Sequence, residues 1–210
     1  MKIGIIGAGM IGATAARAFA AARHTVTLSN SRGPASLAPL VAELGAGAQA
    51  MTVEEAARWA DVLLLAVPWR RPEALPSAGA VAGKIVVDAM NPYAADGAVI
   101  DLGERTSSEH TQERLPQARL VKAFNTVWFR HLAENARISA DIADRHAIFV
   151  AGDDQAAKRV VIGLIEDIGF GGGDTGSLIA GGRRQQPNMT LYNRVMTVAE
   201  AQKAVDGSGS

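Results

Sequence analysis

KIGIIGAGMIG, residues 2–12, joins a short apolar run to the glycine pattern GxGxxG. The apolar run is typical of a buried strand, and the alanine-rich residues that follow are typical of a helix. Between a strand and a helix, this pattern binds the pyrophosphate of a dinucleotide. Gly7 permits the tight turn, Gly9 lets the backbone approach the phosphates, and Gly12 lets the helix pack closely on the strand. Free N–H groups at the helix start favour the same anion. We therefore predict dinucleotide contacts along Gly7, Ala8, Gly9, Met10, Ile11 and Gly12.

A second apolar run, His24–Leu28, leads into the polar segment SNSR. Sites for NAD usually place Asp or Glu about 20 residues after the glycines, where the carboxylate binds a ribose hydroxyl. This segment has no acid. Hydroxyls and a guanidinium instead bind a 2′-phosphate through charge-assisted hydrogen bonds, and a carboxylate would repel it. We predict an NADP(H) site that uses Ser29, Asn30, Ser31 and Arg32. An ordinary solvated turn is the alternative.

The composition restricts the class of protein. A chain of 210 residues fits one domain, or one domain with a small appendage. The lack of cysteine excludes disulfides, thiolate metal sites and cysteine nucleophiles, and no histidine spacing indicates a metal. With 21 basic and 21 acidic residues, a nucleic-acid partner is not expected. The chain has neither an apolar run near the roughly 20 residues that cross a bilayer nor a charged leader. We expect a cytoplasmic protein without a membrane partner.

Apolar runs alternate with amphipathic segments along most of the chain, which predicts an α/β protein with a Rossmann-type doubly wound parallel sheet and a small helical C-terminal portion. Further strands are expected at 48–51, 61–67, 84–88, 120–123 and 147–151, and a last strand that ends at 174–177. Helices are expected at 37–44, 52–59 and 155–168, with one long helix or two shorter ones over 178–205. We predict an NADP-binding domain over 1–177, a helical portion over 178–206, and a disordered or non-native tail over 207–210.

Ligands of such sheets lie beyond the carboxyl ends of the strands, near the point where the strand order reverses. Three predicted strands end in AVPWR, DAMNP and KAFNT, where prolines fix the backbone as two of the strands stop. Backbone groups and an asparagine amide there suit ribose hydroxyls or the nicotinamide carboxamide. We predict cofactor contacts from Val67, Pro68, Trp69, Asn91, Pro92, Ala123, Asn125 and Thr126. The last two also open a predicted helix, so each could cap that helix, contact the ligand, or do both.

Several polar or glycine-rich segments allow two interpretations. Residues 93–117 are the least regular stretch, predicted to be a loop that could cover a ligand. The glycines at 171–173 favour either close backbone approach or a flexible turn. GGRRQQP, residues 181–187, interrupts the last predicted helix, and its arginines would meet an anion or solvent. No acid–base pair is evident, so the catalytic residues stay unassigned. Hydride transfer between two bound rings needs alignment and exclusion of water more than a proton relay.

These segments together resemble the NADP oxidoreductases that reduce or oxidise the deazaflavin coenzyme F-420. The resemblance covers nearly the whole chain, through Ile5–Gly12, Leu28–Pro34, Val121–Thr126, Phe149–Asp154, Asp174–Leu178 and Gly182–Tyr192. The module is also similar to the reductase domain of the six-transmembrane ferric reductases, which passes hydride to a flavin. The resemblance implies a homodimer with NADP(H) over the glycine loop, its 2′-phosphate on Ser29, Ser31 and Arg32, and the partner ring against the nicotinamide. WRR, residues 69–71, matches no fixed family pattern, which leaves the second pocket open.

Three functions remain open on the sequence. The first is an NADPH-dependent oxidoreductase whose acceptor is deazaflavin F-420 or a flavin (FMN or FAD). The second keeps NADPH but reduces a small carbonyl, imine or quinone, and then needs a proton donor. Tyr93, Thr126, Asp174 and Tyr192 are the candidates for that donor, and the sequence does not rank them. The third is a redox sensor that binds NADP(H) without turning it over.

Overall fold

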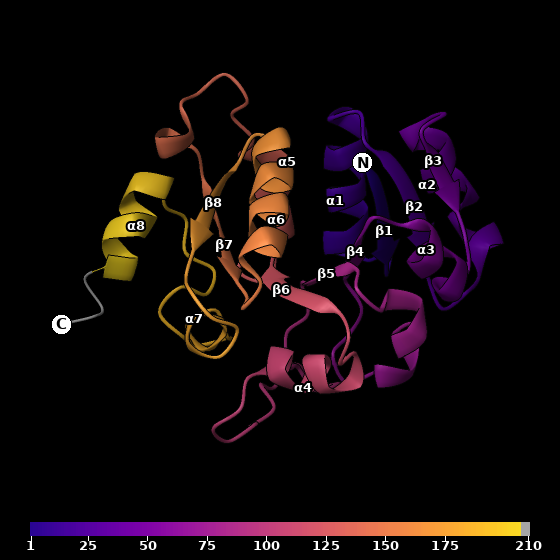
Figure 1. The fold of residues 1–210 in the computed structure, drawn as a ribbon. Helices are drawn as coiled ribbons and strands as arrows, with labels where there is room; N and C mark the ends of the chain where they lie inside the picture. Colours follow the sequence, from indigo (N-terminus) through magenta and orange to yellow (C-terminus); the bar gives the residue numbers. More distant parts are fainter. Residues whose placement is uncertain (207–210) are drawn as a thin grey trace.

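The computed structural model describes residues 1–206 (Figure 1). The predicted tail at 207–210 lies outside the described residues. The strands are β1 Lys2–Ile6, β2 Thr25–Ser29, β3 Ala48–Ala50, β4 Val62–Leu65, β5 Ile85–Asp88, β6 Arg119–Ala123, β7 Ala147–Ala151 and β8 Gly171–Asp174. The helices are α1 Met10–Ala21, α2 Ala38–Leu44, α3 Val53–Trp59, α4 Ser107–Arg114, α5 Phe129–Glu134, α6 Gln155–Asp167, α7 Ala180–Arg184 and α8 Val198–Asp206. Short 3-10 turns are η1 Pro34–Leu37, η2 Pro72–Ala74, η3 Ala78–Val81 and η4 Ile142–Asp144.

The strands form one eight-stranded sheet in the order β3-β2-β1-β4-β5-β6-β7-β8. The order reverses between β1 and β4, so the predicted Rossmann-type α/β fold is confirmed, and the reversal marks the place for a ligand. The sheet is parallel from β3 to β6, but β7 pairs antiparallel with β6, and β8 then runs parallel to β7. The sequence could not reveal this change, because a buried apolar strand has the same pattern in either direction.

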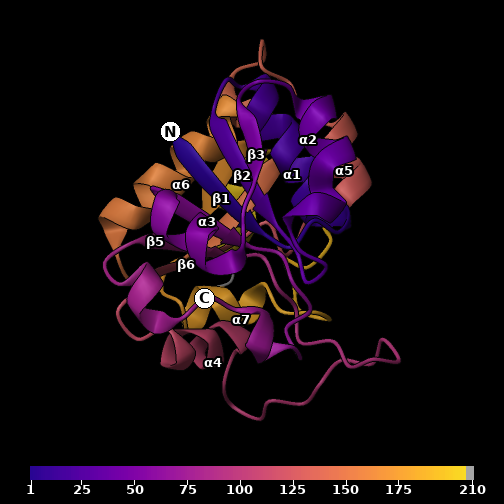
Figure 2. The same ribbon diagram turned by 90° about the vertical axis from the view of Figure 1, so that its right-hand side faces the viewer.

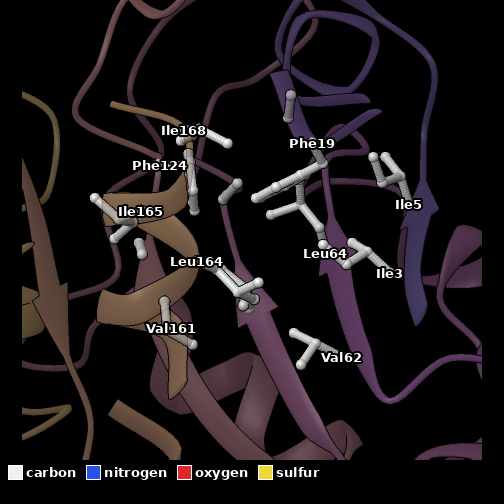
Figure 3. Packing of buried hydrophobic residues seen from close by; sticks show 14 of the residues in the cluster. Ile3, Ile5, Phe19, Val62, Leu64, Phe124, Val161, Leu164, Ile165 and Ile168 are labelled. Atoms are coloured by element: carbon white, nitrogen blue, oxygen red, sulfur yellow. The ribbon is translucent and has the colours of Figure 1, made fainter. Parts of the chain in front are cut away.

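Each face of the sheet carries its own hydrophobic core. In β4, Val62 and Leu64 join one core while Leu63 and Leu65 join the other, because side chains alternate across a strand. The first core packs α1, α5 and α6 on the sheet, with Phe19 of α1 facing residues of α6 across it (Figure 3). Burial on both faces explains why the central strands read as unbroken apolar runs.

The segment between β5 and β6 is more regular than its sequence indicated. Instead of a loop throughout 93–117, it contains the helix α4, which begins with a capping box between Thr106 and Glu109. Glu109 accepts the Thr106 N–H at 2.7 Å, and Thr106 accepts the Glu109 N–H at 3.2 Å. The TSSE sequence is the signature of this box, so the helix start was readable but was missed. Part of the segment between β5 and α4 forms a loop that protrudes from the body of the molecule (Figure 2).

The C-terminal portion forms two short helices rather than one long one, α7 and α8, separated by turns over 185–197. The glycines before it form a strand, β8, and not a flexible turn. A Cβ on Gly171 would overlap Val198 of α8, and one on Gly172 would lie 2.7 Å from Ile162 of α6. The interpretation as close backbone approach is therefore correct. Leu191 and Ala201 also pack on the sheet through Phe149.

The division into a domain over 1–177 and a portion over 178–206 stays a prediction, as do the homodimer and the cytoplasmic location. No helix within residues 1–206 is both long enough and apolar enough to span a bilayer.

Candidate functional site

Two adjoining cavities lie at the carboxyl ends of β1, β4, β5 and β6, where the strand order reverses. The first, of about 470 Å³, lies between the glycine loop and the end of β2, and we name it the adenosine cavity. The second, of about 490 Å³, lies beyond the ends of β5 and β6, and we name it the nicotinamide cavity. Both are lined by Gly9, Ala66, Val67 and Pro68. They therefore form one continuous groove with a shared centre, which suits a molecule made of two nucleotides.

The glycine loop has the backbone geometry that a pyrophosphate site needs. Gly7 has φ 103°, a left-handed conformation that side chains disfavour, and its N–H bonds the Ser29 carbonyl at 2.9 Å. A Cβ on Gly12 would overlap the Gly7 carbonyl oxygen, so only glycine lets α1 start this close to β1. At Gly9 a Cβ would meet no atom within 4 Å. The space beside Gly9 therefore belongs to the groove, where the backbone is open to a ligand.

The adenosine cavity is polar at the end of β2. Asn30 shapes this end, because its Oδ1 accepts the Arg32 N–H at 2.9 Å and its amide donates to the Ser36 hydroxyl at 2.9 Å. Ser31 and Arg32 are exposed and line the cavity. Glu73 is the one acid in the lining of this cavity within residues 1–206, and it pairs with Arg71 at 2.8 Å. The guanidinium of Arg32 thus remains for an anionic ligand.

The floor of the nicotinamide cavity is an asparagine pair from two strand ends. Asn91 Nδ2 donates to the Asn125 carbonyl at 2.9 Å, and Asn125 Nδ2 donates to Asn91 Oδ1 at 3.1 Å and to the Gln185 carbonyl at 2.7 Å. Asn125 Oδ1 is buried and has no hydrogen-bond partner. A buried acceptor without a donor is costly, so a donor of a bound ligand would stabilise it after a small movement of the side chain.

Phe124 turns the chain toward this floor. Its φ of 64° is unusual for a bulky residue and costs about 1–3 kcal/mol. The ring is buried and meets Phe19 edge to face at 6.0 Å, which holds the conformation. After this turn, Asn125 and Thr126 line the cavity, while α5 begins only at Phe129 with Trp128 at its N-cap. The predicted capping role of Asn125 and Thr126 is therefore wrong.

A buried ion pair supports the same wall from behind. Lys122 and Asp88 are fully buried, with Nζ and Oδ2 4.0 Å apart. Lys122 donates to the Met90 carbonyl at 3.2 Å and to Ser108 at 3.0 Å, and Ser108 donates to Asp88 at 2.7 Å. Burial lowers the pKa of Lys122, and the charge of Asp88 opposes that shift. The cluster joins the ends of β5 and β6 to α4. Sequence reasoning missed it, because Lys and Asp inside short strands looked like ordinary strand ends.

Tyr93 and Tyr192 also line the nicotinamide cavity. The Tyr93 hydroxyl donates to the Tyr192 hydroxyl at 3.0 Å. Of the four candidate proton donors, Tyr93, Tyr192 and Thr126 line this cavity. Asp174 lies outside both cavities, where it accepts a hydrogen bond from Lys158 at 2.9 Å.

The three side chains of the WRR segment after β4 lie in three different places. Arg70 lines the nicotinamide cavity and Arg71 the adenosine cavity. Trp69 points away from both, because its Nε1 donates to the Ser107 carbonyl of α4 at 3.0 Å. α4 and α7 lie together at this end of the sheet (Figures 1 and 2), where Gln186 accepts the Ser107 N–H at 3.0 Å.

The comparison with known proteins agrees with this geometry. Residues 2–92 match the profile of the family described as "NADP oxidoreductase coenzyme F420-dependent". A hypothetical protein from Sinorhizobium meliloti is 36% identical with a TM-score of 0.82, over 94% of this chain and 95% of that one. A protein from Arthrobacter sp. FB24, described as a candidate F420-dependent NADP reductase, is 27% identical with a TM-score of 0.73, over 85% and 86% of the two chains. The chain belongs to the F-420-dependent NADP oxidoreductase family.

As a member of this family, the chain is an NADP-dependent oxidoreductase. Its fold extends to more distant enzymes. An imine reductase from Aspergillus terreus, solved with a reduced NADP analogue and dibenz[c,e]azepine, is 19% identical with a TM-score of 0.62. This chain is covered to 99% but spans only 60% of that enzyme, so the likeness concerns the Rossmann fold alone.

Most predicted site residues of this family member line the groove. These are Gly7, Ala8, Gly9, Met10, Ile11, Asn30, Ser31, Arg32, Val67, Pro68, Asn91, Asn125 and Thr126. Five others lie outside its lining, namely Gly12, Ser29, Trp69, Pro92 and Ala123. The reasons differ, since Gly12 packs against Gly7 while the Ser29 side chain is buried beneath the loop. Whether each residue contacts the cofactor stays a prediction.

Proposed function

We propose that this enzyme transfers hydride between NADP(H) and a deazaflavin (F-420) or a flavin, with the cofactor along the groove and the acceptor ring in the nicotinamide cavity. The observation that carries the proposal is the continuity of the two cavities through the glycine loop and Val67–Pro68. A dinucleotide in this groove has its pyrophosphate at Gly9, where the Cβ position is open. Its two ends then fall in different cavities.

The adenosine half is assigned to Arg32 and Ser31, which are exposed in a cavity whose one acid, among the described residues, is already paired. A 2′-phosphate there gains a charge-assisted hydrogen bond from the guanidinium. Asn30 contributes by shaping the turn, since its side chain is engaged with the Arg32 N–H and with Ser36. The Ser29 side chain is fully buried, and its Oγ has no hydrogen-bond partner among the described residues, so burial argues against a direct phosphate contact.

The nicotinamide half is assigned to Asn91, Asn125 and Thr126. The bound cofactor supplies the hydride, and these residues orient its carboxamide and ribose. The cavity walls are largely apolar and aromatic, with Met10, Trp128 and Phe129 among the lining residues. Trp128 is 44% exposed and Met10 66% exposed, so both offer apolar surface to a planar ring at the mouth of the cavity. A ring held there excludes water from the site of transfer.

The test is oxidation of NADPH by the purified protein with F-420, FMN, FAD, quinones and small ketones, followed by the absorbance of the reduced nicotinamide. We expect turnover with at least one flavin-like ring. Turnover with ketones and with no flavin-like ring would contradict the proposal. Tight NADPH binding with no turnover of any acceptor would instead support the redox sensor.

A further inference from the structure

The chain contains only two tyrosines, and their hydroxyls meet in the nicotinamide cavity. They come from distant parts of the sequence, the turn after β5 and the turn after α7. The loops that form the cavity floor also hold this pair. The Tyr93 N–H bonds the Asn91 carbonyl at 2.8 Å, and Asn193, next to Tyr192, donates its N–H to the Thr126 carbonyl at 3.1 Å. The pair is therefore fixed relative to the place where the nicotinamide is proposed to lie.

The tyrosines are the strongest acids that line this cavity. Within the described part of the chain, the lining has no Asp, Glu, His, Lys or Cys. Arg70 also lines the cavity, but an arginine guanidinium does not give up its proton in proteins. Thr126 and the asparagine amides are weaker acids than a phenol. A reaction in this cavity that needs a proton from the protein therefore takes it from a tyrosine hydroxyl.

We propose that Tyr192, supported by Tyr93, is the proton donor for a further activity, the NADPH-dependent reduction of small neutral carbonyl or imine compounds. This inference rests on the NADPH half of the proposed function and not on its acceptor. A flavin or deazaflavin ring that receives hydride spreads the negative charge over the ring, so it needs no strong acid. A carbonyl or imine concentrates the charge on one oxygen or nitrogen, which must be protonated.

The electrons and protons balance with the groups present. The carbonyl or imine carbon accepts the hydride of the reduced cofactor, and the electron pair of the double bond moves to the oxygen or nitrogen. That atom takes the proton of Tyr192. The Tyr192 oxygen then takes the proton of Tyr93 along the 3.0 Å hydrogen bond. Tyr93 is half-buried and regains its proton from water. The products are NADP⁺ and an alcohol or amine, with one solvent proton consumed.

The 3.0 Å bond between the two hydroxyls allows either one to donate, and proton donation by Tyr192 uses one of these orientations. When Tyr93 is the donor in this bond, the Tyr192 proton is free to point into the cavity. Burial is the main cause that raises the pKa of Tyr192 above its usual range. Tyr192 thus remains protonated at neutral pH, as a donor must. Tyr93 acts through Tyr192 and is a positioning residue.

The kinetic test compares two substrates that differ only in their need for a proton. Dihydroisoquinoline, a neutral imine at alkaline pH, needs hydride and a proton, whereas N-methyl-dihydroisoquinolinium needs hydride alone. We expect the wild-type protein to oxidise NADPH with both. Tyr192→Phe should lower kcat/KM for the neutral imine by about 100-fold or more, the scale of general acid catalysis. The loss for the iminium should be at least about tenfold smaller.

A second measurement reads the pair without turnover. Tyrosinate absorbance in the ultraviolet reports Tyr93 and Tyr192 alone, because no other tyrosine exists in the chain. In Tyr93→Phe the remaining signal belongs to Tyr192, and its midpoint should lie above the usual value of about 10. A midpoint at or below that value would overturn the assigned environment. Trp59→Phe, an aromatic substitution at neither cavity, is the matched control and should leave both tests unchanged.

The outcomes separate this inference from the proposed function. Turnover with F-420 or FMN, with neither imine compound reduced by the wild type, overturns this inference and leaves the proposed function standing. Reduction of the imines without any flavin turnover leaves this inference standing and overturns the proposed function. Equal losses with both imine substrates in Tyr192→Phe show that the hydroxyl does not donate the proton, and also overturn the inference.

Discussion

The adenosine cavity and the nicotinamide cavity share one groove but are built in different ways. Half of the lining of the adenosine cavity, including its glycine loop and its polar end, comes from the first βαβ unit, where the loop and the end of β2 are close in sequence. The nicotinamide cavity needs the ends of β4, β5 and β6, and it is closed by Tyr93 and by Tyr192, 99 residues later. Local pattern determines the first cavity, and long-range packing determines the second.

This difference matters for how the two halves can vary. Residues of the adenosine cavity depend on backbone geometry, as at Gly7 and Gly12, which a substitution disturbs directly. Residues of the nicotinamide cavity depend on a network behind them, in which the buried Lys122 and Asp88 connect two strand ends to α4. Different acceptors can then be accommodated by changing the closing segments while the cofactor half remains constant.

The largest effect is expected from Gly12→Ala, in the glycine loop that forms part of the adenosine cavity. A Cβ there overlaps the Gly7 carbonyl, and a backbone atom cannot move aside as a flexible side chain can. We expect a loss of more than about 3 kcal/mol in the free energy of unfolding, measured by urea denaturation. Gly9→Ala is the matched control, because its Cβ meets no atom within 4 Å and its φ is −78°. That variant should stay within about 0.5 kcal/mol of wild type but bind NADPH at least about tenfold more weakly. Equal stability of both variants would contradict the packing role of Gly12.

The corresponding test of the nicotinamide cavity, which depends on long-range packing, is Lys122→Met. Removing one partner of a buried pair leaves Asp88 as an uncompensated charge, and the expected cost is about 3–5 kcal/mol in the free energy of unfolding. Lys122→Met combined with Asp88→Asn should recover part of that loss, because the buried charge is then removed. If the double variant is no more stable than the single one, the two residues are not coupled. The turnover number for NADPH oxidation should fall by a larger factor than the affinity for NADPH, because the network supports the nicotinamide cavity.

The contrast between the halves also explains what the sequence predicted. The glycine loop, the helix after it and the NADP-type segment at 29–32 were readable because neighbours in sequence form them. The strand ends were readable as positions, yet Trp69 faces α4 and Asn125 with Thr126 precede rather than cap α5. The reversal of β7, the left-handed Phe124 and the Lys122 cluster depend on contacts between distant segments. No local pattern encodes those contacts.

Arg32→Ala tests the adenosine cavity with a smaller effect. The proposed contact is a hydrogen bond to a charged phosphate, so its loss should weaken NADPH binding by about 1.5–3 kcal/mol and leave NADH binding nearly unaffected. Fluorescence titration of both cofactors measures this. Arg71→Ala is the matched control, because Arg71 lines the same cavity but is already paired with Glu73. Equal losses for NADPH and NADH in Arg32→Ala would show that Arg32 does not select the 2′-phosphate.

The smallest effect is expected from Trp69→Phe, which tests whether the two halves are connected through the segment after β4. Phenylalanine keeps an aromatic ring but removes the Nε1 donor that bonds the Ser107 carbonyl at 3.0 Å. That carbonyl also accepts the Thr111 hydroxyl at 3.1 Å, so it does not become unsatisfied. The loss of unfolding free energy should therefore be near the lower end of about 0.5–1.5 kcal/mol. Because Arg70 lines the nicotinamide cavity and Arg71 the adenosine cavity, any loosening of this segment should weaken NADPH binding and lower turnover together. A loss confined to one of these measurements would mean that Trp69 supports one cavity only, and that the halves are joined at the glycine loop alone.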